Sequence, residues 1–461
     1  MKKFSIGLIG LGVMGAHLAR NLASKGFRTL VFNRTPEKTD AFLLQFGDKN
    51  LRGEKTLENF IHALEVPRRI ILMVNAGEAV DQVIGEILPL LEEGDLIMDG
   101  GNSHYRDTMR REQQLASKKI HFVGCGISGG AEGALNGASI MPGGTPEAYA
   151  QMKDVLEAIA AKDFQGRPCV THLGSSGSGH YVKMIHNGIE YAMLQTLAEA
   201  YDLQKRFLMS SPDQVATVFE QWNHGRLQSF LLDLAVKVLR KKDSITKGYL
   251  VDVISDVTGQ KGTGIWMVNE SLERGSPTPS IAEAVFARSL SSQKDLRHEL
   301  AKRFPKANMF HPEKTDVFLK KLEATVVASW MSIFDQGMRL LARACEEEQW
   351  PRDLSEVARI WQGGCIIRTR SLEAIEQAFK SGNEHFFFDQ CNVSLLAWRE
   401  IVSLAAHKGL PTPVLSSALN YVETLTSDRL PLNLVQGLRD AFGMHGFERL
   451  DRPGESHADW S

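Results

Sequence analysis

The sequence lacks long apolar runs and an excess of charge of either sign. Its apolar stretches, such as 70–74 and 401–406, fall well short of the roughly 20 residues that cross a bilayer, and its first residues do not form a signal-peptide pattern. Lys and Arg number 53 against 55 Asp and Glu, a net charge of -2, so the molecule has no overall field that would attract nucleic acid. We therefore expect a cytoplasmic protein with neither a membrane nor a nucleic-acid partner.

The sequence also has few cysteines, and their arrangement argues against two kinds of site. The five cysteines are widely spaced, and none belongs to a CxxC pair. An odd number at such spacings indicates neither a disulfide framework nor a zinc site. We expect reduced thiols and no bound metal.

What the chain does contain is two kinds of periodicity, one after the other. Over the first 175 residues, short β-rich runs alternate with helical stretches, which is typical of a parallel sheet with helical crossovers. The expected strands are 4–9, 29–32, 69–74, 95–99, 121–123 and 170–173. After Gly179 the segments are long and have the 3.6-residue period of helices. These expected helices are 180–206, 212–222, 227–240, 280–297 and 315–348.

These patterns predict an α/β Rossmann-like parallel-sheet domain, followed by a large all-α domain and a short C-terminal tail. We place the first domain at 1–176, the helical domain at 177–434 and the tail at 435–461. The Gly- and Ser-rich segment 174–179 joins the two domains. Its composition fits either a flexible linker or a loop of close backbone approach at the start of a helix.

The expected first strand runs into a GxGxxG turn that opens a helix. In this strand-turn-helix setting, the glycines let backbone N–H groups approach a pyrophosphate at the helix N-terminus. The turn therefore predicts a dinucleotide site. Its residues are Gly10, Leu11, Gly12, Val13, Met14 and Gly15.

The residues after the second expected strand indicate which dinucleotide binds. The strand 29–32 ends in Asn33, Arg34 and Thr35 rather than in the Asp or Glu that binds an NAD ribose. A guanidinium and a hydroxyl at this place suit a 2′-phosphate, and the guanidinium can also stack on the adenine. We expect NADP in preference to NAD.

A chemically mixed polar stripe follows the Gly- and Ser-rich segment. An isolated amphipathic helix usually turns such a stripe to water. Here the stripe combines basic, acidic, amide and phenol groups directly after a glycine-rich loop, so we favour a site. At 100° per residue its members share one face of the expected helix, and they are Lys183, His186, Asn187, Glu190 and Tyr191.

Three further segments suit the binding of anions. Two follow expected strands, where open α/β sheets bind ligands and where successive N–H groups can hold a carboxylate. The third is a glycine-flanked basic cluster suited to phosphate, although each segment taken alone could be an ordinary surface loop. The residues are Asn102 in the first segment, Ser128, Gly129 and Gly130 in the second, and Lys261, Thr263 and Arg288 in the third.

Together these segments resemble the decarboxylating 6-phosphogluconate dehydrogenase family over essentially the whole chain. The matching stretches, in order, are GLIGLGVMG, NRT, DGGNS, GISGGAEGA, MPGG, GHYVKMIHNGIEY, GQKGTG, EAVFARSLSS, GGCIIR and RDAFGMH. The resemblance implies an NADP-dependent enzyme of the pentose phosphate pathway that oxidises 6-phosphogluconate and releases CO2 to give ribulose 5-phosphate. Smaller relatives that oxidise β-hydroxy acids lack so long a helical domain.

The resemblance also implies roles for individual residues. Lys183 would act first as base and then as acid, at a depressed pKa, and Glu190 would protonate C1 of the product. NADP would contact Val74, Asn75, Ala76 and Asn102 besides the glycine turn and 33–35. Asn102, Ser128, Gly129, Gly130, His186 and Asn187 would hold the hydroxyls and the carboxylate of the substrate. Tyr191, Lys261, Thr263 and Arg288 would bind its phosphate.

In the family, tail residues of a second subunit complete the phosphate site, and here they correspond to Arg439 and His445. The resemblance therefore implies a homodimer. Two positions depart from the family, which usually has a lysine at Asn75 and a basic residue at Ile265. The loss of a charge at Asn75 predicts either weaker binding of NADP or a weaker preference for NADP over NAD.

Two other functions stay open at this point. One is an NADP-linked dehydrogenase for another phosphorylated β-hydroxy acid that uses the same lysine. The other is a catalytically idle protein that senses NADP or a sugar phosphate on the same fold, because a fold alone does not imply a function.

Overall fold

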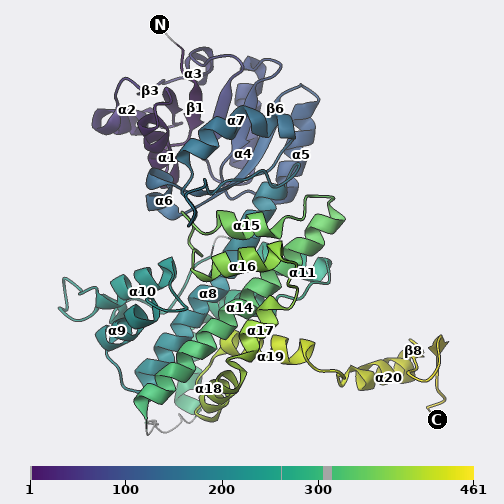
Figure 1. The fold of residues 1–461 in the computed structure, drawn as a ribbon. Coiled ribbons are helices and arrows are strands. Elements are labelled where there is room, and N and C mark those ends of the chain that lie inside the picture. Colours follow the sequence, from purple (N-terminus) through teal and green to yellow (C-terminus); the bar gives the residue numbers. More distant parts are fainter. Residues whose placement is uncertain (1–2, 261, 305–313, 461) are drawn as a thin grey trace.

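The molecule consists of an α/β domain and a helical domain, with a C-terminal tail that extends away from the helical domain (Figure 1). The structure is a computed structural model and describes residues 3–260, 262–304 and 314–460. The predicted fold class, a Rossmann-like domain followed by a large helical domain, is confirmed. In the part of the chain that is described, no helix is both long and apolar enough to cross a membrane.

One sheet of seven strands forms the centre of the first domain, in the order β3-β2-β1-β4-β5-β6-β7. The strands from β3 to β6 pair in parallel, and β7 pairs antiparallel to β6. Their bounds are β1 Ile6–Ile9, β2 Thr29–Phe32, β3 Leu51–Gly53, β4 Arg69–Leu72, β5 Leu96–Asp99, β6 His121–Ser128 and β7 Ser139–Pro142.

Both faces of this sheet are covered by helices, so the central strands are buried on both sides. Neighbouring residues on β1 show this, because Leu8 and Ile9 belong to different core clusters. The helices of the domain are α1 Val13–Ser24, α2 Pro36–Phe46, α3 Leu57–His62, α4 Glu78–Ile87 with the 3-10 turn η1 Leu88–Leu90, α5 Tyr105–Ala116, α6 Gly130–Asn136 and α7 Pro146–Ile159.

The strand predictions were wrong at the edges of the sheet. β3 and β7 were not expected, since one has three residues and the other ends in proline. The segment 170–173 is not a strand, because it contacts β7 through a single bridge between Val170 and Ile140. β6 continues past its expected end at residue 123 to Ser128, although glycines in a strand normally weaken it.

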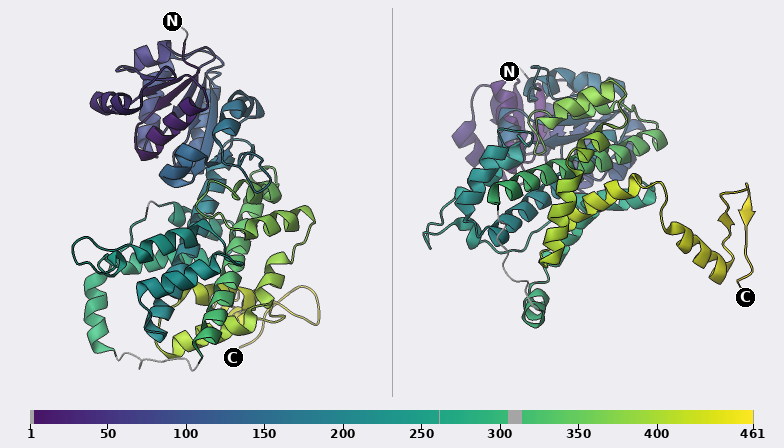
Figure 2. Two further views of the ribbon diagram at one scale, coloured as in Figure 1. Left: turned by 60° about the vertical axis from the view of Figure 1, so that its left-hand side comes forward. Right: turned by 60° about the horizontal axis from the view of Figure 1, so that its bottom comes forward.

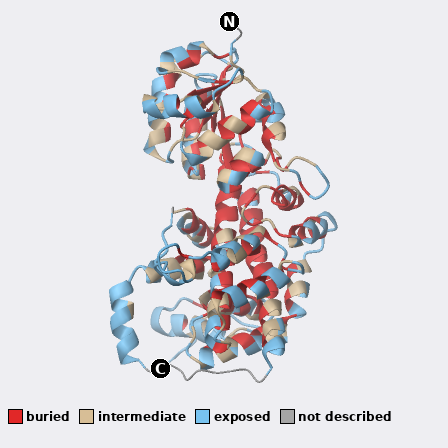
Figure 3. Cartoon of the chain, turned by 90° about the vertical axis from the view of Figure 1, so that its left-hand side faces the viewer, coloured by how far each residue is buried: buried red, intermediate tan, exposed pale blue. Residues whose placement is uncertain are grey.

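A long buried helix, α8 Ser178–Phe207, connects the two domains. Figure 3 shows it as a largely buried rod that leaves the sheet and enters the helical domain. At its start, a Cβ on Gly179 would lie 2.3 Å from the Met141 carbonyl oxygen and 2.4 Å from that of Gly124. Segment 174–179 is therefore a loop of close backbone approach and not a flexible linker.

The helical domain is built around α8 and the slightly longer α14, which pack against each other. Its remaining helices surround this pair (Figures 1 and 2). The bounds are α9 Pro212–Trp222, α10 Phe230–Arg240, η2 Leu250–Asp252, α11 Thr263–Glu273, α12 Pro279–Ser291, α13 Lys294–Arg303, α14 Thr315–Glu347, α15 Leu354–Ile360, α16 Ser371–Lys380, α17 Phe386–Asn392, α18 Leu395–His407 and α19 Pro413–Leu425.

The expected helix 280–297 is in fact two helices, α12 and α13. α12 ends at a run of serines, where the hydroxyl of Ser291 donates to the Arg288 carbonyl and that of Ser292 donates to the Ser289 carbonyl. Such side-chain hydrogen bonds compete with the helical pattern and favour a helix end. The expected helix 227–240 begins later, at Phe230, because the Ser229 hydroxyl caps it by accepting from the Leu232 N–H.

The tail folds on itself and projects from the body of the molecule (Figures 1 and 2). It consists of α20 Leu432–Gly443 and a small hairpin of β8 Phe447–Glu448 and β9 Glu455–Ser456. The carboxylate of Asp440 holds it together by accepting from the Gly446 N–H and from the indole N–H of Trp460.

Candidate active site

The GxGxxG turn lies between β1 and α1, and its three glycines differ in what an added side chain would contact. Gly10 has a φ of 104°, and a Cβ there would lie 2.5 Å from the Met73 carbonyl oxygen. A Cβ on Gly15 would lie 2.0 Å from the carbonyl oxygen of Gly10. A Cβ on Gly12 would instead point into open space. The first and third glycines thus shape the turn, and the second leaves room above the N-terminus of α1 for a ligand.

Asn33 fixes this turn from the neighbouring strand. Its Oδ1 accepts from the Leu11 N–H at 3.0 Å, and its Nδ2 donates to the Thr35 carbonyl at 3.2 Å. Arg34 and Thr35, which follow β2, are left exposed in the cleft beside the turn.

This cofactor cleft has a volume of about 320 Å³. The structure brings seven of the predicted cofactor residues into it: Gly10, Gly12, Asn33, Arg34, Thr35, Val74 and Asn75. Leu11, Val13, Gly15 and Ala76 adjoin these residues in the chain but are not part of the lining, and Met14 and Asn102 line a second pocket. Lys38 and Gln82 also line the cleft and were not predicted.

The second pocket, of about 600 Å³, lies where the two domains meet and is called the substrate pocket below. Its lining combines loops after the strands of the sheet with one face of α8 and the start of α11. The predicted residues that line it are Met14, Asn102, Ser128, Gly129, Gly130, Lys183, Asn187, Glu190, Tyr191, Thr263 and Arg288.

Lys183 is placed by the close approach of α8 to β6. A Cβ on Gly126 would lie 2.3 Å from Cβ of Lys183, so the glycine in the strand makes room for the lysine. The amine then lies 3.5 Å from Nδ1 of His186, and that nitrogen lies 3.7 Å from Oε2 of Glu190. Nε2 of His186 lies 3.0 Å from the hydroxyl of Ser128. His186 itself is fully buried behind the pocket wall.

Burial sets the protonation of this group of side chains. It lowers the pKa of Lys183, although the nearby Glu190 carboxylate acts in the opposite direction. The pKa of His186 falls well below its usual range, because burial and the charge of Lys183 both disfavour imidazolium. Burial also raises the pKa of Glu190, against the effects of Lys183 and Arg288. Burial thus shifts both groups toward their neutral forms, in which an amine can serve as a base and a carboxyl as an acid.

Another part of the pocket wall, around Tyr191, is basic. The guanidinium carbon of Arg288 lies 3.5 Å from the centroid of the Tyr191 ring, and NH1 donates to the Gly259 carbonyl at 3.3 Å. Thr263 is the first residue of α11 and follows Gly262, which has a φ of 90°. A cation beside a helix N-terminus suits an anion.

Besides His186, which lies behind the wall, three predicted substrate residues do not line this pocket. Lys261 lies outside the described residues. Arg439 and His445 are on the projecting tail, away from the substrate pocket of their own chain (Figure 1). Conversely, the pocket includes Ile127, Gly259, Gln260 and Ile366, which lie within the matching stretches but were not predicted as site residues. Ile366 comes from the loop between α15 and α16, and only the three-dimensional fold brings it near α8.

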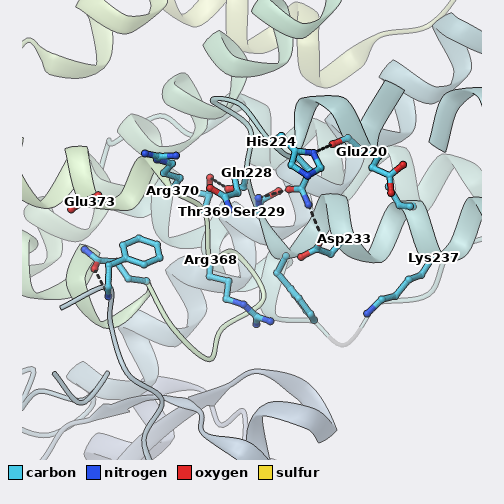
Figure 4. Close-up of a pocket in the computed structure, with 15 residues that line it drawn as sticks. Glu220, His224, Gln228, Ser229, Asp233, Lys237, Arg368, Thr369, Arg370 and Glu373 are labelled. Carbon is cyan, nitrogen blue, oxygen red and sulfur yellow. Dashed lines mark hydrogen bonds between the residues drawn. The ribbon is translucent and has the colours of Figure 1, made fainter. Parts of the chain in front are cut away.

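A larger hollow of about 960 Å³ lies between α9, α10 and the start of α16 (Figure 4). It contains none of the predicted site residues. Several of its polar groups are paired with neighbours: Glu220 bonds Arg240, and Asp233 accepts from Asn223. The predicted catalytic residues, Lys183 and Glu190, therefore line the substrate pocket and not this larger hollow.

Comparison with known proteins agrees with this geometry. Residues 5–174 match the profile of the NAD binding domain of 6-phosphogluconate dehydrogenase, and residues 179–460 match the profile of the C-terminal domain of that enzyme. The chain belongs to the 6-phosphogluconate dehydrogenase family.

Relatives in this family match over their full length. The decarboxylating 6-phosphogluconate dehydrogenase of Lactococcus lactis subsp. lactis is 45% identical over 470 residues, covering 100% of this chain and 99% of the relative. That of Staphylococcus aureus strain N315 is 43% identical, covering 99% and 98%. Among solved structures, 6-phosphogluconate dehydrogenase of Plasmodium falciparum aligns with a TM-score of 0.94 at 40% identity, over 99% of this chain and 100% of that one. The Plasmodium enzyme was studied in complex with NADP+ and with 6-phosphogluconate.

Proposed function

We propose that this protein catalyses the NADP-dependent oxidation and decarboxylation of 6-phosphogluconate to ribulose 5-phosphate and CO2. The observation that carries the proposal is the buried amine of Lys183, which lines a pocket together with Glu190 and with a basic group of residues around Arg288. The dinucleotide turn adjoins the same pocket through Met14, and the relatives named above support this activity.

The residues of the cofactor cleft fit NADP. The open space above Gly12 leaves room for a pyrophosphate at the N-terminus of α1, and Asn33 holds the turn in place. Arg34 and Thr35 would bind the 2′-phosphate, and Val74 and Asn75 would line the opposite wall. When bound, NADP accepts the hydride that leaves C3 of the substrate.

In the first step, the neutral amine of Lys183 accepts the proton of the C3 hydroxyl while the hydride departs from C3. Desolvation makes this possible, because it lowers the free-energy cost of removing the proton from the ammonium before substrate binds. The neutral imidazole of His186 lies beside the amine without adding a positive charge. The product of this step is a 3-keto acid.

In the second step, the bond between C1 and C2 breaks and CO2 leaves. The electron pair of that bond moves toward the C3 carbonyl, whose oxygen takes the proton back from the Lys183 ammonium. Glu190 then donates a proton to the former C2, which is C1 of the ketose, while the hydroxyl on the neighbouring carbon returns its proton to the Lys183 amine. The raised pKa of Glu190 favours the protonated form that this transfer needs.

The remaining pocket residues orient the substrate. Asn102, Ser128 and Asn187, with the backbone of Gly129 and Gly130, would hold the hydroxyls and the carboxylate, and His186 would support Ser128. Tyr191, Thr263 and Arg288, with Lys261, would bind the phosphate at the basic part of the wall.

We also propose a homodimer in which the tail of each chain enters the site of the other. The tail carries Arg439 and His445 away from their own body (Figure 2). Exposed apolar side chains cover it, as expected of a surface that packs on another chain. They are Leu432, Leu434, Val435, Leu438, Phe442 and Met444.

A cytoplasmic location fits the state of the thiols. All five cysteines are buried and free of disulfides. Reduced thiols are the usual state of cytoplasmic proteins.

Product analysis in D2O tests the proposed reaction. Incubation with NADP and 6-phosphogluconate should give ribulose 5-phosphate with one deuterium at C1, because the proton donated by Glu190 exchanges with solvent. A 3-keto product that keeps its carboxylate would show that the protein is a simple hydroxy-acid dehydrogenase.

A further inference from the structure

Arg111 lies between the loop that lines the cofactor cleft and the loop that carries Asn102 into the substrate pocket. It is on α5, and its side chain is only 1% exposed. Arginine is rarely so completely buried unless its guanidinium is fully paired. The partners of Arg111 come from two segments: the start of α4 with its N-cap, and the end of β5 with the loop that follows it.

On the cofactor side, Arg111 holds the start of α4. Its NH2 donates to the Gly77 carbonyl at 3.0 Å, and its Nε and NH2 each donate to the carboxylate of Asp81 at 2.9 Å. Gly77 is the N-cap of α4 and follows Val74 and Asn75, which line the cofactor cleft. The position of this loop therefore depends on the guanidinium.

On the substrate side, Arg111 contacts the end of β5. Its NH1 lies 3.5 Å from Oδ2 of Asp99 and 3.4 Å from the hydroxyl of Ser103. The buried Asp99 carboxylate accepts from the Gly101 N–H at 3.0 Å and from the Ser103 hydroxyl at 2.6 Å. Gly101 and Ser103 precede and follow Asn102 in the chain, so these bonds fix the backbone on both sides of Asn102.

The helix that carries Arg111 is anchored to the catalytic helix as well. One turn before Arg111, the hydroxyl of Thr108 lies 2.7 Å from Nδ1 of His180. His180 is on α8, one turn before Lys183. The guanidinium is thus held at a fixed position relative to the proposed base.

We propose that Arg111 is a positioning residue that couples the cofactor cleft to the substrate pocket. A planar guanidinium can bond two loops at once in fixed directions, which a lysine ammonium cannot do. Ordering of one loop by its ligand then reduces the entropy cost of ordering the other, so each ligand tightens the binding of the other. This inference rests on the proposed function, because it takes the two pockets as sites for NADP and 6-phosphogluconate.

The test compares Arg111→Lys with Arg110→Lys. Arg110 is the matched control: it also pairs with Asp81, at 3.0 Å, but is largely exposed, and in the described chain it bonds neither Gly77 nor Asp99. Binding of NADPH is followed by fluorescence with and without 6-phosphogluconate, a pair of ligands that cannot react with each other. Steady-state kinetics give KM and kcat for both substrates.

In the wild type and in Arg110→Lys, 6-phosphogluconate should tighten NADPH binding by the same factor. In Arg111→Lys that factor should fall to about 1, and both KM values should rise about three- to thirtyfold while kcat changes less. Equal coupling in Arg111→Lys and the wild type, or no coupling in the wild type, would overturn the proposal. A loss of thermal stability with unchanged KM values would also overturn it, because that is the result of a merely structural role.

A second variant covers the case in which Arg111→Lys does not fold. Ser103→Ala removes the hydroxyl between Arg111 and Asp99 and leaves both charges in place, so the coupling factor should fall in the same direction by a smaller amount. The titration needs no turnover. Absence of 6-phosphogluconate oxidation by the wild type would therefore contradict the proposed function separately, whereas unchanged coupling in Ser103→Ala would contradict the role of Arg111.

Discussion

The amine of Lys183 and Nδ1 of His186 lie 3.5 Å apart, one turn from each other on α8 and with both side chains buried. Two positive charges at this distance without water would repel strongly. Burial lowers the pKa of Lys183, and burial together with the charge of Lys183 lowers the pKa of His186 well below its usual range. The pair therefore has at most one positive charge near neutral pH, and Lys183 can lose its proton to become a base.

The first prediction concerns Lys183 itself. Lys183→Met should abolish the reduction of NADP while 6-phosphogluconate still binds within about tenfold of the wild-type affinity, because the proton acceptor is lost but most contacts remain. Stopped-flow absorbance for NADPH and calorimetry for binding measure the two effects. Turnover close to that of the wild type would exclude Lys183 as the base.

The pH profile of kcat/KM provides the second prediction. Activity should fall on the acid side, as Lys183 becomes protonated, with a midpoint below the usual pKa of a lysine because burial lowers the pKa of this amine. The Glu190 carboxylate partly opposes that effect. Glu190→Gln removes the negative charge and should move the midpoint to lower pH, besides reducing the rate.

A matched control for this shift is Asp202→Asn on the same helix. Asp202 lies nineteen residues after Lys183 on α8, which is about 28 Å along a helix. This distance is several screening lengths at ordinary ionic strength. The carboxylate of Asp202 is paired with Arg206. The pH profile of Asp202→Asn should have the same midpoint as that of the wild type. An upward shift in Glu190→Gln would show that the carboxylate does not stabilise the ammonium.

The third prediction concerns cofactor choice. Arg34→Ala should raise KM for NADP by roughly 10- to 100-fold, the effect of one lost charge-assisted contact, and should change KM for NAD much less. Arg52→Ala is a suitable control, because Arg52 is an exposed arginine on the adjacent edge strand β3 outside the cleft. Equal effects of Arg34→Ala on the two cofactors would refute the contact with the 2′-phosphate.

The proposed dimer leads to the fourth prediction. A chain with Arg439→Ala and His445→Ala, and a chain with Lys183→Met, should each be nearly inactive alone. Coexpression should restore about one quarter of the wild-type activity, because half of the dimers are mixed and each mixed dimer has one complete site. No recovery in a sample shown by sedimentation to contain mixed dimers would contradict a tail that acts in the partner's site.

Much of this architecture was predictable from local sequence because the relevant features are local. The GxGxxG turn follows a strand and opens a helix, and the polar face of α8 repeats at helical spacing. Asn33 was expected only to contact the cofactor, yet its bond to the Leu11 N–H shows that it also holds the turn. Such a bond joins two loops more than twenty residues apart, which no local pattern indicates.

Other features depend on tertiary contacts that the sequence does not display. β3 has three residues, too few for a recognisable alternation, and Ile366 reaches the pocket from a distant loop. Arg111 stands between the charged residues Arg110 and Glu112 on α5, and only the fold buries it between Gly77 and Asp99. The placement of Arg439 and His445 depends on a second chain.

The measurement that tests the central claim most directly is the stoichiometry of NADPH and CO2 in one sample. The purified protein is incubated with 6-phosphogluconate labelled at C1 and with NADP, and in a parallel sample with NAD. Our account predicts one labelled CO2 for each NADPH and a faster reaction with NADP than with NAD. NADPH without CO2 would indicate an ordinary hydroxy-acid dehydrogenase, and NADP binding with no turnover would indicate a protein that only senses its ligands; either result would contradict the account.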